Sequence, residues 1–317
     1  MMNKVFTFIF FVFIALSVYS QDTTISKIDT ISKVDTISKM DTLANKDTIK
    51  TKKKPKYWTI KNNLILNFEQ SQISNWATGG YSNFAFGAMF KGYYNFKYKK
   101  HKVDNTIELS YGRTRQDISG EGIWDKSNEW VKSDDKIELN SIYGYEAVGK
   151  WNYSGLMNIK TQFDDGFDKN KVLVSTTLSP TIITTSIGME YKRTNFSVLF
   201  SVVTGKTTYS YSDEQSVKQS IFGSDWQKDW LFSVGPYIKI FYQRDIIKNV
   251  NLLGKLDVFW DYSKPLLDTD ISGEVFINMK VNKYISTFFS FQAAIDKDFN
   301  TKLQYKERFG ISIPLNF

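Results

Sequence analysis

Charged side chains recur at every second position in several stretches of this 317-residue sequence, where they alternate with apolar residues. Because one face of each stretch is polar and holds both signs of charge, these side chains either pair with one another or line a hydrated space. The pattern indicates a polar interior and not a catalytic centre. The positions that we expect to line this interior are Lys91, Glu108, Glu138, Lys160, Lys239, Lys255, Asp257, Glu274, Lys306 and Arg308.

Residues suited to catalysis or metal binding are sparse. His101 is the only histidine, and it lies among lysines in "KYKKHKVD". A catalytic nucleophile needs a base that a third group orients, and no such partner adjoins His101. The string "FDDGFDKN" gathers Asp164, Asp165 and Asp168 but lacks the closing glutamate of a calcium loop. We therefore expect no enzymatic activity, no cofactor and no metal site.

Two groups of aromatic residues are candidates for ligand contacts. Trp76, followed by Gly79 and Gly80 in "NWATGGYSNF", fits either a ligand-stacking platform or a loop between strands whose glycines adopt positive φ. The tryptophan pairs in "IWDKSNEWVKSDD" and "DWQKDWLF" fit sugar stacking or anchoring at a membrane interface. We favour the structural interpretation for both groups, since a membrane barrel carries aromatic girdles in any case.

The elements that position these residues have a period of two. In "GEVFINMKVNKYISTFFSFQAAID", residues 273–296, apolar and polar residues alternate on both sides of Asn282-Lys283, which predicts a tight hairpin. About twelve such runs fill the chain from Trp58 onward, each long enough for the roughly 9 to 11 tilted residues that cross a bilayer. Short turns alternate with long polar loops, as in outer-membrane barrels.

A soluble β-sandwich also has alternating strands, so it is the competing fold. Its strands usually have only about five or six residues, whereas these runs are longer and carry aromatic residues near their ends. Because a bilayer core contains no water, strands that span it can satisfy all their backbone hydrogen bonds only in a closed barrel. We therefore predict an all-β fold, an antiparallel transmembrane β-barrel of residues 58–317.

The first 57 residues differ from the rest of the chain. Residues 1–20 combine Lys4 with an apolar run too short to span a bilayer, as in a secretory signal peptide. Residues 21–57 repeat "DTISKV"-like hexads and end in a lysine-rich stretch, which predicts a flexible tail. The sequence contains no cysteine, which excludes disulfide bonds.

Several strings resemble an uncharacterised family of exported β-rich proteins from Bacteroidota, catalogued as domain of unknown function 3078. They include "QISNWATGGYSNFAF", "DDKIELNSIYGYEA", "MNIKTQF" and "IIKNVNLLGKLDVF", within Ile60 to Phe317. The resemblance implies an exported β-rich fold and supplies no activity and no catalytic residues.

These features predict a protein of the outer membrane in a Gram-negative-type envelope, acting as a passive channel for small polar solutes. The alternatives are a structural or interaction barrel tethered through its tail to a periplasmic partner, and a soluble exported β-sandwich. The expected partners are outer-membrane lipid and, through the last strand ending in Phe317, the barrel-assembly machinery; nucleic acid is not expected. Pro314 removes one backbone donor from that strand, so the sequence leaves its last few pairings open.

Overall fold

The computed structural model describes residues 57–71, 82–118, 121–168, 170–296 and 300–316. The predicted signal peptide, nearly all of the tail, Trp76, Gly79, Gly80 and Phe317 lie outside the described residues.

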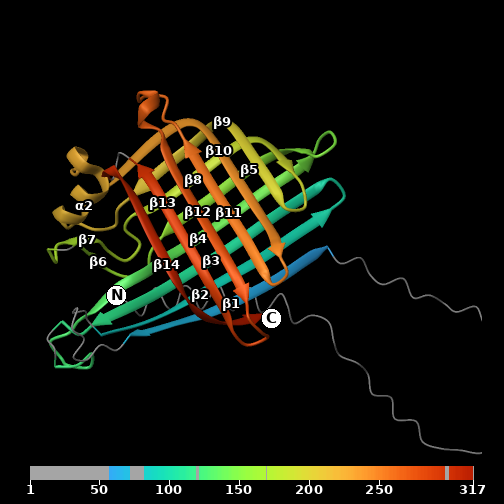
Figure 1. Cartoon of the computed structure of the whole chain (residues 1–317). Coiled ribbons are helices and arrows are strands. Elements are labelled where there is room, and N and C mark those ends of the chain that lie inside the picture. Colours follow the sequence, from blue (N-terminus) through green and yellow to red (C-terminus); the bar gives the residue numbers. More distant parts are fainter. Residues whose placement is uncertain (1–56, 72–81, 119–120, 169, 297–299, 317) are drawn as a thin grey trace, which may run out of the picture. The chain divides into compact units, whose positions relative to one another are not determined.

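Twelve antiparallel strands form one closed barrel, which confirms the predicted fold class (Figure 1). Around the barrel, each strand pairs with its neighbour in the chain, and the last strand returns to the first. The strands are β1 (Trp58–Ser71), β2 (Asn83–Tyr98), β3 (His101–Gln116), β4 (Trp130–Glu146), β5 (Trp151–Thr161), β8 (Thr181–Lys192), β9 (Phe196–Tyr209), β10 (Trp230–Ile247), β11 (Val250–Phe259), β12 (Asp270–Lys280), β13 (Ser286–Asp296) and β14 (Asn300–Asn316).

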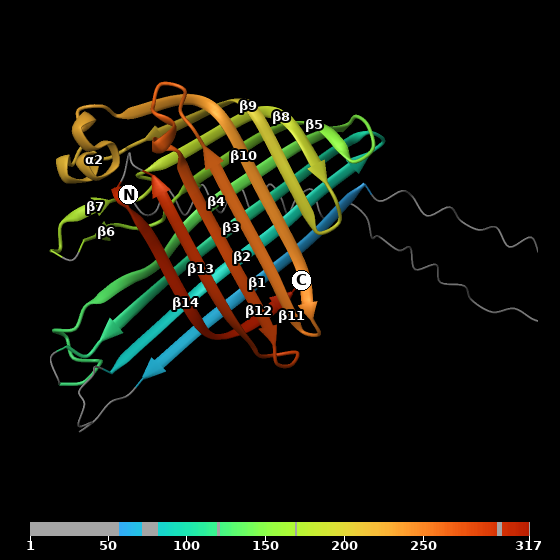
Figure 2. The ribbon, with the colours of Figure 1, turned by 45° about the horizontal axis from the view of Figure 1, so that its top comes forward.

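The two ends of the barrel differ in their connections (Figure 2). At one end, short turns join β2 to β3, β4 to β5, β8 to β9, β10 to β11 and β12 to β13. The opposite end carries long loops, which contain β6 (Gly166–Phe167), β7 (Leu173–Ser175), α2 (Gln215–Phe222), η1 (Gly223–Asp225) and η2 (Leu266–Asp268). Among the described residues, no helix is long and apolar enough to cross a bilayer.

The predicted hairpin of residues 273–296 is present, although its turn spans residues 281–285 and is longer than expected. The side-chain carbonyl of Asn282 closes this turn by accepting the backbone N–H groups of Tyr284 at 2.7 Å and Ile285 at 2.9 Å. An asparagine that caps its own turn in this way is a common turn signal.

The barrel closes where β14 meets β1. Residues Asn63–Phe68 of β1 pair with Ile311–Asn316 of β14, and Pro314 lies opposite Ile65. Pairing therefore continues past the proline as far as Asn316. Apolar residues of β14 point outward, as Phe309 and Ile311 do, whereas Ser312 is buried on the inner face.

Strict alternation fails in β9. Val202 and Val203 both point outward, while Ser201 and Thr204 on either side of them are fully buried inside. The Ser201 hydroxyl holds this β-bulge by donating to the backbone carbonyl of Ile187 at 2.8 Å and accepting the N–H of Val203 at 3.2 Å. A bulge adds one residue to one strand, so every residue beyond it changes face.

Candidate functional site

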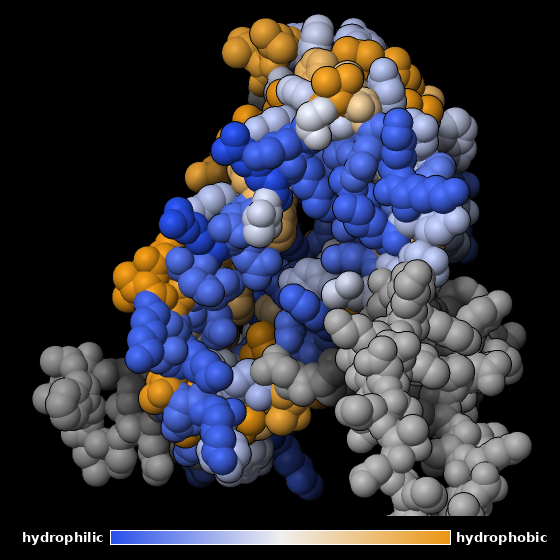
Figure 3. Space-filling view, turned by 90° about the vertical axis from the view of Figure 1, so that its right-hand side faces the viewer, coloured by the Kyte–Doolittle hydropathy of each residue, from blue (hydrophilic) through white to orange (hydrophobic). Residues whose placement is uncertain are grey.

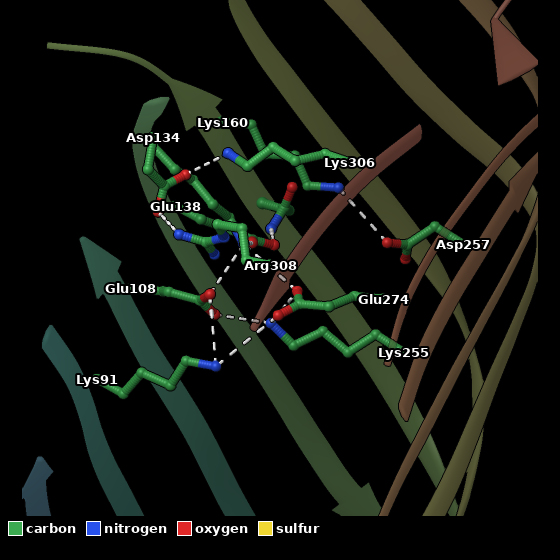
Figure 4. Close-up of polar contacts among 12 residues, drawn as sticks. Lys91, Glu108, Asp134, Glu138, Lys160, Lys255, Asp257, Glu274, Lys306 and Arg308 are labelled. Atoms are coloured by element: carbon green, nitrogen blue, oxygen red, sulfur yellow. Dashed lines mark hydrogen bonds and ion pairs between the residues drawn. The ribbon is translucent and has the colours of Figure 1, made fainter. Parts of the chain in front are cut away.

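The predicted charged positions come together inside the barrel, where they form ion pairs across the interior (Figure 4). At their centre is a group that we call the charged layer, made of Lys91, Glu108, Lys136, Glu138, Lys255 and Glu274. Its lysines and glutamates balance in charge. All three glutamates are buried, with Glu108 only 2% exposed.

Glu108 lies within 3.5 Å of all three lysines of the charged layer. Its carboxylate lies 2.7 Å from the ammonium of Lys255 and 3.0 Å from that of Lys136. Lys91 is held less closely, at 3.5 Å from Glu108 and 3.9 Å from Glu274. Charges removed from water need such partners, because an unpaired buried charge is strongly destabilising.

The charged layer joins opposite walls of the barrel. Glu108 lies on β3 and Lys255 on β11, and five strands separate these two in either direction around the barrel. A direct contact at 2.7 Å between them means that side chains bridge the interior at this level. The interior is therefore filled here and is not an open bore.

Apolar side chains complete the filling. Met89, Leu253, Phe276 and Phe288 are buried and pack together on the inner face. The ammonium of Lys91 lies 4.9 Å from the centre of the Phe276 ring. The sequence left open whether the inward side chains pair with one another or line a hydrated space, because alternation fixes which face a residue occupies and says nothing about what that face contacts. At this level the charged side chains pair, and apolar side chains pack beside them.

A second ionic group surrounds Asp257. Its carboxylate accepts hydrogen bonds from the ammonium of Lys239 at 2.9 Å and from the hydroxyl of Tyr237, and Lys160 lies 3.4 Å away. Tyr237 was missed in the sequence because its neighbours Gly235 and Pro236 obscure the alternation at the start of β10.

Lys306 and Arg308 on β14 both pair with Asp134 on β4, the first at 2.5 Å. Asp134 is not among the positions selected from the sequence, although the alternation Asp134, Lys136, Glu138 identifies it as an inward-facing residue of β4. Lys206 forms a further cross-barrel group with Asp270 at 2.7 Å and Asp296 at 2.8 Å.

Three cavities lie above and below the charged layer. The cavity at the short-turn end has a volume of about 450 Å³, and its lining includes Glu138, Lys255 and Glu190. The two at the long-loop end measure about 400 Å³ and 370 Å³. Glu138 and Lys255 line cavities on both sides, so a single layer of side chains separates them.

The residues considered for catalysis or calcium binding have other contacts. His101 is exposed at the start of β3, with Nδ1 2.8 Å from the hydroxyl of Tyr143. Asp164 accepts hydrogen bonds from Tyr111 at 2.7 Å and from Arg113, while Asp168 accepts the backbone N–H groups of Asn170 and Val172. Within the described ranges, no group of three or more histidine or acidic residues is arranged to hold a metal ion.

Asp164 fixes the loop between β5 and β8 to the outer side of β3. Partial burial alone would raise the pKa of Asp164, but the hydrogen bonds from Tyr111 and Arg113 outweigh it and lower this pKa. The loop is also held from β4, since the side chain of Asp135 accepts the backbone N–H groups of Phe163 at 2.7 Å and Asp164 at 3.0 Å.

Of the predicted tryptophan pairs, Trp124 and Trp130 lie close together with ring centres 6.3 Å apart. Trp130 also contacts the outward-facing Phe86 at 5.4 Å, and Trp124 remains 67% exposed. The pair therefore extends the outer aromatic surface of β2 at the long-loop end.

Comparison with known proteins agrees with the resemblance seen in the sequence. Residues 68–167 match the model of a family described as "Protein of unknown function (DUF3078)". No curated protein matches the chain.

The solved structures that the chain matches include outer-membrane proteins of low sequence identity. The translocator domain of autotransporter NalP from Neisseria meningitidis is 10% identical, with 82% of this chain and 89% of that chain covered and a TM-score of 0.35. An outer membrane channel from Pseudomonas putida F1 is 11% identical, with 83% and 96% covered and a TM-score of 0.37. Outer membrane phospholipase A from Escherichia coli is 11% identical, with 81% and 97% covered and a TM-score of 0.33.

Proposed function

We propose that this protein resides in the outer membrane and provides a passage for small polar solutes, which the charged layer closes in the conformation described. The short-turn end faces the periplasm in this proposal, because short periplasmic turns and long external loops are usual in such barrels.

The exposed aromatic residues support the membrane location, because they form two belts. Those near the short turns are Trp58, Tyr98, Tyr143, Tyr145, Trp151 and Tyr153, and those near the long loops are Phe86, Trp124, Tyr211, Trp230, Phe232 and Tyr262. On β2, Phe86 lies at the level of the belt near the long loops and Phe96 at the level of the belt near the short turns. Ten residues at ~3.3 Å each, tilted by ~40°, span about 25 Å along the barrel axis, which matches the apolar band of outer-membrane barrels.

The observation that carries the proposed passage is the shared lining of the cavities. Glu138 and Lys255 face the cavity at the short-turn end and also one at the long-loop end. Displacing these two side chains would join the cavities without any movement of the strands. The linings of both cavities include charged and amide side chains, such as Asn140 in one and Gln292 in the other, which can hydrogen-bond small polar solutes.

Planar-bilayer recordings test the passage. We expect rare, small conductance events from the wild-type barrel, and a several-fold higher conductance from the double variant Glu138→Ser/Lys255→Ser, which shortens the charged layer and keeps the net charge unchanged. The matched control is Lys102→Ser/Glu146→Ser, which removes an ion pair of 2.7 Å outside the charged layer. This control should conduct like the wild type.

If both the wild type and Glu138→Ser/Lys255→Ser are silent after confirmed insertion, the interior is a packed core and the passage is refuted. A structural or interaction barrel, tethered through residues 21–57 to a periplasmic partner, would then be the better proposal. Recovery of the protein in the soluble periplasmic fraction would refute the membrane location itself.

A further inference from the structure

The short-turn end of the barrel carries basic residues in every connection. Its turns contain Lys99 and Lys100, Lys150, Arg193, Lys248, and Lys283. The long loops at the opposite end are rich in carboxylates instead, such as Asp125, Asp168 and Asp229. Figure 3 looks onto the short-turn end, where hydrophilic residues surround a hollow.

Three of these cations lie over aromatic rings. Lys99 is 5.3 Å from the ring centre of Tyr98, Arg193 is 5.7 Å from that of Tyr191, and Lys283 is 4.6 Å from that of Tyr284. Arg193 also donates a hydrogen bond from Nε to the hydroxyl of Tyr191 at 2.8 Å. Tyr98 and Tyr284 are 41% and 63% exposed, so their rings remain available to a membrane.

We propose that these three cation–aromatic pairs, Lys99/Tyr98, Arg193/Tyr191 and Lys283/Tyr284, bind the phosphate headgroups of anionic phospholipids in the leaflet that faces the short turns. The inference rests on the membrane location proposed above and is independent of the solute passage.

The position of the three cation–aromatic pairs at the edge of the apolar barrel surface favours a lipid headgroup as their ligand. An aromatic ring at the edge of an apolar barrel surface lies at the membrane interface, where Lys and Arg extend their charged ends toward the headgroups. Tyr98 belongs to the belt near the short turns, the ring of Tyr191 lies 5.3 Å from that of Trp151 in the same belt, and Tyr284 is exposed in the turn between β12 and β13. A basic residue near an anionic surface gains about fivefold in association, and this gain decreases with salt.

The distribution of the pairs around the barrel favours a leaflet over a folded partner. The turns that carry them join β2 to β3, β8 to β9 and β12 to β13, which are four strands apart in the closed order of twelve. A bilayer surrounds the barrel and reaches all three sites at once. An acidic protein would contact one side of the rim only.

Spin-labelled lipids test the proposal on the full chain inserted in phosphatidylcholine vesicles. We expect the protein-immobilised fraction to be several-fold larger for phosphatidylglycerol than for phosphatidylcholine, and high salt to abolish this difference. The variant Lys99→Gln/Arg193→Gln/Lys283→Gln should lose the preference. The control Lys126→Gln/Lys171→Gln/Lys228→Gln, which removes three cations from the long loops, should retain it.

The outcomes separate the two proposals. Failure of the wild type to insert would refute the membrane location, whereas insertion without a preference for phosphatidylglycerol would overturn only the lipid sites. Persistence of the preference in the short-turn variant would also overturn them. So would binding of polyglutamate to the detergent-solubilised wild type without any lipid preference, because the rim would then serve an acidic soluble partner. The salt dependence is measured on the wild type, so the test stands even if the variant does not fold.

Discussion

Glu108 and Lys255 are 147 residues apart in the sequence and on opposite walls of the barrel, yet their charged groups lie 2.7 Å apart. The contact is part of the charged layer, in which the same glutamate also pairs with Lys136. Because Glu108 is almost completely buried, its charge depends on these lysines and they depend on it.

Removing the charge of Glu108 should destabilise the barrel strongly. We expect Glu108→Gln to lower the free energy of unfolding by about 3–5 kcal/mol, because Lys255 is left buried without its nearest carboxylate. Urea titration in lipid vesicles, followed by the gel shift between folded and unfolded barrel, measures the change. Glu108→Gln/Lys255→Gln should recover much of this loss, since it leaves a hydrogen-bonding neutral pair.

The control for this prediction is Glu146→Gln, whose partner Lys102 lies at 2.7 Å and whose side chain is 38% exposed. An exposed pair contributes at most about 1 kcal/mol. Equal losses from Glu108→Gln and Glu146→Gln would mean that water reaches the charged layer freely.

The inner and outer faces of β12 should respond differently to arginine. Val275 points outward near the middle of the strand, so Val275→Arg should cost about 2–4 kcal/mol in a bilayer. Asn278 faces the interior near the short-turn end, and Asn278→Arg should cost less. Comparable losses at both positions would contradict the assigned faces.

Cysteine labelling checks the same faces without a stability measurement. A water-soluble maleimide should modify Asn278→Cys in the folded barrel and leave Val275→Cys unmodified. Ser290 also points inward but is only 1% exposed, so the expectation from alternation alone that it faces water is wrong. Ser290→Cys should therefore resist labelling as well.

Gly235 in β10 allows a close approach between strands. A Cβ at this position would lie 1.7 Å from the backbone carbonyl oxygen of Trp260, and a backbone atom has little freedom to move. We expect Gly235→Ala to destabilise the barrel by about 1–3 kcal/mol through overpacking. Gly254→Ala is the matched control, because nothing lies within 4 Å of its Cβ, and its effect should stay within about 0.5 kcal/mol.

Acid should release the loop that Asp164 fixes. Since hydrogen bonds from Tyr111 and Arg113 lower the pKa of Asp164, its contribution is complete above the ordinary value of 3.8 and is lost as the pH falls below that value. At neutral pH, Asp164→Asn should imitate the acid state and increase tryptic cleavage at Lys171. Asp165→Asn, next to it, should cleave like the wild type, and equal cleavage of both variants would contradict the anchoring role.

The period of two was sufficient to predict the strand number, the hairpin of residues 273–296 and the face of most charged residues. It failed at Val202 and Val203, where a bulge held by a serine hydroxyl leaves no mark in the hydropathy pattern.

The ion-pair partners across the barrel interior could not be predicted from the sequence. Alternation predicts that Lys306 and Asp134 point inward. Their contact, however, depends on the stagger of β14 relative to β4 once the barrel has closed. The buried group of Met89, Leu253, Phe276 and Phe288 was missed for the same reason. A single apolar residue on an inward face does not predict a cluster, because the cluster forms only when opposite walls of the barrel bring several such residues together.

The contacts inside the barrel have a consequence for how the chain folds. Lys306 and Arg308 lie 172 and 174 positions after Asp134 in the chain, and Lys255 lies 147 positions after Glu108. Until the last strands arrive, Asp134 and Glu108 on the early strands have no cation from β11 or β14. An intermediate that lacks those strands would therefore hold Asp134 without its cations and Glu108 with only Lys91 and Lys136, and contacts of such long range slow folding. Assembly of this barrel should thus be cooperative over nearly the whole chain, with no stable half-barrel along the way.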